Sequence, residues 1–117
     1  MFLEEIAMMQ MKIRIDKNKL MGLKNNLILI VDKELLDGGL LIEQEAKRLS
    51  PVKTGRHRDG IHLVHKLLQI TISDSDDYGI FLEFGTIKMS PRPHFRPAFY
   101  KYAPEIGERI RRNIEGL

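Results

Sequence analysis

The chain has 117 residues and a mass of 13.6 kDa, the size of one domain with one hydrophobic core. Hydrophobic residues make up 43% and charged residues 30%, which excludes wholesale disorder. There is no cysteine, so disulfides and thiolate metal sites are excluded, and a reducing compartment suits the chain. The longest apolar run, residues 27–31, is far shorter than the roughly 20 residues of a membrane span. Glu4 and Glu5 stand where a signal peptide would be basic.

The formal net charge of +3 is unevenly distributed along the chain. Residues 51–72 carry a balance of +3, residues 73–86 a balance of −4 and residues 87–102 a balance of +4, whereas both flanks cancel. Alternating blocks of this kind suit faces that meet complementary faces of neighbouring molecules. A soluble surface with charges sorted by chance is the alternative, and charge alone favours it.

The first half of the chain predicts a strand and a long helix. Residues 11–16 alternate apolar and charged side chains, as in a half-buried strand, and residues 1–10 are expected to form a short helical or loose arm. From about Leu20 to Leu49, apolar residues recur every three, four or seven positions, which predicts one helix. Gly38 and Gly39 indicate either a break into two helices or a close approach by another backbone, and we favour one kinked helix. Ser50-Pro51 ends the helix.

The second half predicts strands and then a second helix. Strands are expected at residues 61–65, 68–73 and 78–84, and apolar residues from Phe99 to Ile114 recur at helical spacing, with Pro104 expected to kink or restart the helix. The predicted fold is therefore α+β in a single domain: a four-stranded, mostly antiparallel sheet with a long N-terminal helix and a C-terminal helix packed on one face.

Signatures of enzymatic or metal chemistry are scarce. His57, His62 and His65 suggest a metal site, but strand residues three apart point to opposite faces, so His62 and His65 should diverge. No glycine-rich phosphate loop and no serine nucleophile motif occurs. The basic segment 51–60 could touch phosphates, yet no basic recognition helix accompanies it. We expect no catalytic residue, cofactor or metal.

Three segments together resemble the head–tail joining, or tail-completion, proteins of long-tailed bacteriophages and prophages (the gene-product-ten-like neck family). Residues 46–55 resemble a helix end followed by Pro-Val-x-Thr-Gly, residues 78–86 a strand ending in Glu-Phe-Gly-Thr, and residues 89–98 a loop with Arg-Pro-x-x-Arg-Pro-Ala. The chain departs from the family pattern at four positions: His57, Gly60, Gly79 and His94.

The resemblance implies a non-enzymatic ring subunit of the virion, assembled in the host cytoplasm, around a channel through which DNA passes without sequence-specific binding. The implied partners are copies of the chain, head-closure proteins and the tail terminator, and the isolated chain is expected to be monomeric as many neck proteins are. No membrane is implied. The alternative is a small nucleic-acid-binding accessory protein of a phage or prophage.

Ring subunits need two different, complementary faces, which the charged blocks could supply. The residues expected at subunit or partner interfaces are Lys53, Thr54, Arg56, Arg58, Glu83, Phe84, Thr86, Lys88, Arg92 and Arg96. The specific hypothesis pairs Glu83 with Arg92 or Arg96 of a neighbouring subunit. A buried Glu83–Arg pair within one chain is the competing account. The loop from Ile87 to His94 is expected to become ordered on docking.

Overall fold

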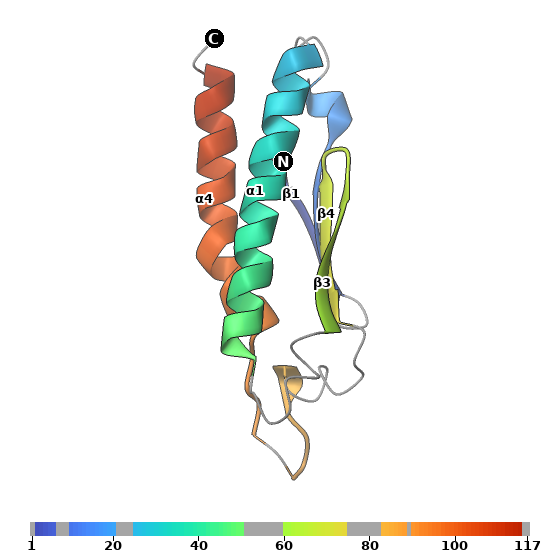
Figure 1. The fold of residues 1–117 in the computed structure, drawn as a ribbon, viewed down its shortest axis with the longest axis vertical. Helices are drawn as coiled ribbons and strands as arrows, with labels where there is room; N and C mark the ends of the chain where they lie inside the picture. The colour runs from blue at the N-terminus through green and yellow to red at the C-terminus, as the bar shows by residue number, and fades with distance from the viewer. Residues whose placement is uncertain are drawn as a thin grey trace.

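The computed structural model describes residues 2–6, 10–20, 25–50, 60–74, 83–88 and 90–115 (Figure 1). In chain order, its elements are β1 (Phe2–Ile6), β2 (Gln10–Ile15), the short 3₁₀ helix η1 (Lys17–Leu20), α1 (Asn25–Leu49), β3 (Ile61–Lys66), β4 (Gln69–Asp74) and α4 (Phe95–Glu115). The predicted α+β class, with two helices and an antiparallel sheet, is confirmed.

The strands lie in the order β1-β2-β4-β3, and every neighbouring pair is antiparallel. Strands β2, β3 and β4 form where the alternation predicts them. The expected arm at residues 1–10 is corrected, because Phe2–Ile6 pairs with β2 as strand β1. The predicted strand at 78–84 is not confirmed: residues 75–82 lie outside the described residues, and Glu83 and Phe84 have helical conformation.

Both helices lie on the same side of the sheet, with α1 between α4 and the strands (Figure 1). The core joins apolar side chains from one face of the sheet, such as Ile13 and Ile70, to the inner stripe of α1 and to Phe99, Ile106 and Ile110 of α4. The stripe predicted for the first helix includes Val31, Leu35, Ile42 and Ala46, and all four are buried.

Helix α1 runs without a break through Gly38 and Gly39. Consecutive residues lie about 100° apart around a helix, so the two glycines face different neighbours. A Cβ on Gly38 would collide with Ile106 of α4, and a Cβ on Gly39 would lie 2.6 Å from the Ile70 side chain of the sheet. The pair therefore allows side chains from both neighbouring layers to pack directly against the helix backbone.

Helix α4 begins at Phe95, before the first residue of its predicted apolar stripe, and continues through Pro104. Pro104 is exposed, so its ring points away from the core. Pro104 has no N–H to donate to the Tyr100 carbonyl, and its ring crowds that carbonyl. The buried positions, Phe95, Ala98, Phe99, Ile106 and Ile110, form one face that packs against α1.

Candidate functional site

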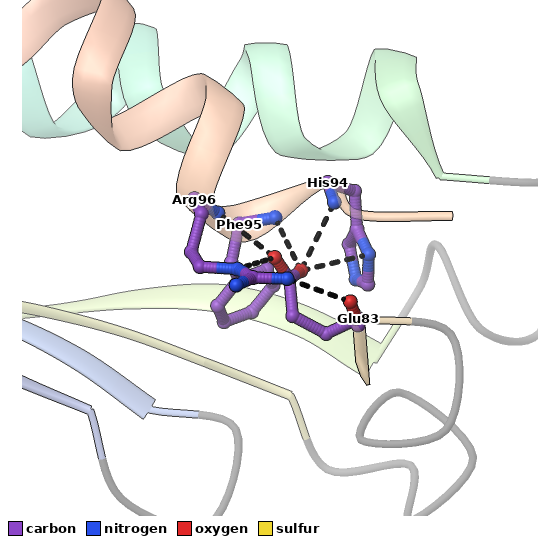
Figure 2. A network of polar contacts seen from close by, with 4 residues as sticks. All are labelled: Glu83, His94, Phe95 and Arg96. Carbon is purple, nitrogen blue, oxygen red and sulfur yellow. Dashed lines mark hydrogen bonds and ion pairs between the residues drawn. The ribbon is translucent and has the colours of Figure 1, made fainter. Parts of the chain in front are cut away.

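The carboxylate of Glu83 lies at the N-terminus of α4, although eleven residues separate Glu83 from His94 (Figure 2). Its Oε1 accepts hydrogen bonds from the backbone N–H groups of His94 (3.0 Å) and Phe95 (2.9 Å). Its Oε2 accepts bonds from the backbone N–H of Arg96 (3.2 Å) and from Arg96 Nε (2.8 Å). Glu83 is 1% exposed, so this is a buried polar cluster.

These bonds satisfy the unpaired donors at the start of the helix. The first four N–H groups of an α-helix have no partner inside it. The His94 carbonyl accepts the N–H of Ala98 at 3.4 Å, which makes His94 the N-cap. The N–H groups of His94, Phe95 and Arg96 all bond to Glu83, and the fourth position is Pro97, which has no N–H. Glu83 is thus a complete cap supplied by a distant segment.

Arg96 fixes the carboxylate from its outer side. Its Nη2 donates to the Glu83 carbonyl oxygen at 2.9 Å, and its guanidinium lies over the Phe84 ring, 4.7 Å from the centroid. One arginine therefore holds both the side chain and the backbone of Glu83 and stacks on the next residue. This bidentate and stacked arrangement is one that lysine cannot reproduce.

The electrostatics of the cluster favour an ionised Glu83. Burial opposes ionisation, but the Arg96 side chain and the three backbone N–H groups outweigh it, so the pKa of Glu83 lies below its usual value. The positive end of the helix dipole acts in the same direction. His94, which is fully buried, places Nδ1 3.3 Å from Glu83 Oε1.

The segment between Glu83 and His94 leaves this anchor and projects from one end of the molecule (Figure 1). Gly85 has a φ of 78°, a left-handed conformation that glycine adopts without strain, and the Lys88 N–H donates to Thr86 Oγ1 at 3.2 Å. Ile87 is completely exposed and Phe84 is 51% exposed. Thr86, Lys88 and Arg92 are also exposed. We call Phe84, Thr86, Ile87, Lys88 and Arg92 the projecting loop.

The structure corrects the hypothesis that Glu83 pairs with Arg96 of a neighbouring subunit. Glu83 pairs with Arg96 of its own chain and is buried there. Arg92 is exposed and makes no bond to Glu83. The expected interface residues Lys53, Thr54, Arg56 and Arg58 lie outside the described residues. The expectation that loop 87–94 becomes ordered on docking is not tested.

The histidines of β3 diverge, as strand geometry predicts. His62 Nε2 lies 3.1 Å from Ser73 Oγ, whereas His65 Nε2 lies 3.0 Å from both carboxylate oxygens of Asp32 on α1. His57 lies outside the described residues. Within the described ranges, no group of three histidine, cysteine, aspartate or glutamate side chains is arranged to hold a metal ion.

Two polar contacts between elements were not predicted. Asp32 Oδ1 accepts the backbone N–H of Leu68 at 2.7 Å, which ties α1 to the β3–β4 turn. Glu45 of α1 pairs with Arg48 and with Lys101 of α4, whose Nζ lies 3.4 Å from Oε2. The hydrogen bonds and charges of Arg48 and Lys101 outweigh partial burial, so the pKa of Glu45 is lowered. In the sequence, Asp32 and Glu45 stand out only as acidic residues beside the apolar stripe of the first helix.

Comparison with known proteins identifies the family to which the chain belongs. A family model described as "Bacteriophage HK97-gp10, putative tail-component" matches residues 14–85. The chain therefore belongs to the HK97-gp10-like family of phage proteins, which confirms the resemblance stated above. No curated protein and no solved structure matches the chain.

The matched range contains Glu83 and Gly85 but ends before Arg92 and Arg96. The family is one of structural phage components related to the tail. Among the described helices, none combines the length and the apolar character needed to span a membrane.

Proposed function

We propose that this protein is a non-enzymatic subunit of a ring at the phage head–tail junction, located in the virion and assembled in the host cytoplasm. It joins head-closure proteins to the tail through contacts with copies of itself and with the tail terminator, around the channel for DNA. Membership of a family of phage tail components supports the structural role. No observation favours an accessory nucleic-acid-binding protein over this role.

The observation that carries the proposal is the projecting loop on its rigid base. An apolar side chain as exposed as Ile87 gains nothing from the fold of its own chain. The same loop carries an exposed aromatic ring, Phe84, and the exposed cation Arg92. Aromatic residues and arginines are the side chains that most often dominate binding energy at protein interfaces. The loop is therefore suited to entering a recess on a neighbouring subunit.

The Glu83 cap contributes by reducing the entropic cost of docking. Binding is weakened when a loop must be ordered as it docks. Glu83 and Arg96 hold both ends of the loop, so fewer conformations are lost on assembly. In this revised proposal Lys88 and Arg92 meet the acidic face of a neighbour, and Lys53, Thr54, Arg56 and Arg58 stay proposed interface residues.

Co-purification with head-closure and tail-terminator proteins from the same phage, followed by imaging, tests the proposal. Ile87→Ser combined with Arg92→Ser should abolish ring assembly while the free energy of unfolding changes by less than about 0.5 kcal/mol, since both side chains are exposed. The control is Leu29→Ser with Lys33→Ser, two exposed positions on α1. Normal assembly of the loop variant would contradict the proposed contact, and catalytic turnover by the purified chain would contradict the structural role.

A further inference from the structure

The face of the sheet opposite the helices carries three cations on strands β2 and β3. In β2, β4 and β3, the residues that alternate with the core positions point to this face. From β2 and β3 they include Lys12, Arg14 and Lys66, and from β4 they are Gln69, Thr71 and Ser73. No acidic residue occupies an outward position of these three strands, and Val64 is their only apolar residue there. We call this surface the open sheet face.

The strand register brings the three cations close together. Arg14 lies opposite Gln69, which in turn lies opposite Lys66, so two interstrand spacings, about 10 Å, separate Arg14 from Lys66. Lys12 and Arg14 alternate on one strand and lie about 7 Å apart. On β4, Thr71 is buried and the Ser73 hydroxyl lies 3.1 Å from His62 Nε2, so the half-buried Gln69 is the polar neighbour of the cations. The surface therefore offers three closely spaced positive charges, with Gln69 between Arg14 and Lys66.

These cations differ from those of the helices in having no carboxylate partner. Every lysine and arginine of α1 and α4 lies within ion-pair distance of an acidic side chain, for example Lys33 with Asp37 and Arg112 with Glu108. Within the part of the chain that the structure describes, no carboxylate pairs with Lys12, Arg14 or Lys66. The helices neutralise their own charge, whereas Lys12, Arg14 and Lys66 have no such ion-pair partner among the described residues.

We propose that the open sheet face contacts the phosphate backbone of double-stranded DNA without reading its sequence. Lysine and arginine, together with serine, threonine and glutamine side chains, are the groups that contact DNA phosphates. A protein-binding surface would instead have an apolar or aromatic centre, which these three strands lack. Single-stranded DNA would call for exposed aromatic rings that stack on bases, and these strands have none.

This inference rests on the proposed function for its setting, because a subunit around the channel lies beside the packaged DNA as it passes. Three phosphate contacts give weak binding that salt abolishes, so they could guide DNA without retaining it. By counterion release, the affinity should fall roughly 40-fold between about 50 mM and about 200 mM salt for three neutralised phosphates. Because these contacts do not read bases, salt should weaken the affinity equally for all DNA sequences, whereas sequence-specific binding would differ from one sequence to another.

The test measures fluorescence anisotropy of a labelled random-sequence duplex of about 30 base pairs with the full chain at low salt. The sheet variant combines Lys12→Gln, Arg14→Gln and Lys66→Gln. The control variant combines Lys33→Gln, Lys47→Gln and Arg112→Gln on the helices. The wild-type chain has a formal net charge of +3, and each variant loses three positive charges. The two variants therefore have equal net charge. Circular dichroism verifies that both are folded.

Loss of binding and of salt dependence in the sheet variant, with binding retained by the control, supports the proposal. Equal loss in both variants, no DNA binding by the wild type, or displacement of DNA by polyglutamate at equal charge concentration would overturn it. A sheet variant that still forms the ring with its neck partners separates a failure of this inference from a failure of the proposed function.

Discussion

At the scale of single residues, Glu83 replaces a cap that the local sequence lacks. Helices usually begin at serine, threonine, aspartate or asparagine, whereas α4 begins after His94. The capping carboxylate comes from eleven residues upstream and is held by Arg96. The same two residues that the charge pattern suggested as an intersubunit pair are thus partners within one chain.

Replacing Glu83 should therefore lower stability before it affects assembly. Glu83→Ala removes the partner of three backbone donors and leaves Arg96 without its carboxylate, so we expect a loss of about 3 kcal/mol in the free energy of unfolding. Glu83→Gln keeps one acceptor oxygen and should lose less. Chemical denaturation measures both. Unchanged stability together with failed ring assembly would restore the intersubunit pairing.

Asp32 has a comparable role at the β3–β4 turn. Leu68 has a φ of 59°, a conformation strained for a residue with a side chain, and its N–H donates to Asp32 while its carbonyl accepts the Ile15 N–H at 2.9 Å. Asp32→Ala should lower the free energy of unfolding by about 2 kcal/mol, since it leaves a part-buried N–H unpaired. Asp37→Ala, at an exposed site on the same helix, should change it by less than about 0.5 kcal/mol. Equal effects in urea denaturation would show that the turn does not depend on Asp32.

At the scale of elements, the glycine pair sets how closely α1 packs against both neighbours. Gly38→Ala should gain up to about 1 kcal/mol in helix propensity but lose more through the collision with Ile106, for a net loss of about 1–2 kcal/mol. Gly39→Ala should cost less, because its nearest contact is the terminal methyl of Ile70.

A double-mutant cycle checks this packing. Ile106→Ala alone should cost about 3 kcal/mol because it leaves a cavity in the core. In the Gly38→Ala background the same change should cost less, since it also removes the collision. Additive free energies in thermal or chemical denaturation would mean that Gly38 and Ile106 do not limit the packing of α1 on α4.

At the scale of the whole molecule, the acidic groups predict how stability depends on pH. The pKa values of Glu45, Glu83 and Glu108 are all lowered, with Arg48, Arg96 and Arg111 respectively as the main favourable partners. A lowered folded-state pKa contributes stability above the unfolded value of about 4.3, and this contribution is lost as the pH falls through the folded value.

The melting temperature should therefore fall as the pH drops below about 4.5, where the carboxylates with lowered pKa values begin to be protonated. Glu83→Gln should make this fall shallower, because Glu83 is the most buried of the three. Melting curves across this range measure the effect. A melting temperature that rises on acidification, or an identical slope in Glu83→Gln, would contradict it.

The molecule measures 52 × 21 × 20 Å, with the projecting loop at one end of its long axis (Figure 1). The helices, strands β2, β3 and β4 and their buried faces could be predicted from period and alternation, since residues such as Val31 and Ile13 reveal their burial through regular spacing. The anchored loop could be predicted only in part. Glu83, Phe84 and Arg92 stood out by motif, but only contacts between distant residues distinguish a capping carboxylate from a docking carboxylate.

The sequence by itself determined the class of fold, the two helices, three of the strands and the phage family, because periodicity and short motifs are properties of neighbouring residues. Tertiary structure alone decided that residues 2–6 complete the sheet and that Gly38 and Gly39 pack against two different layers, α4 and the sheet. It also decided that Glu83 caps helix α4 of the same chain. Each of these depends on which distant groups meet. A charge or a glycine in a sequence does not specify its partner; packing brings the partner within bonding distance.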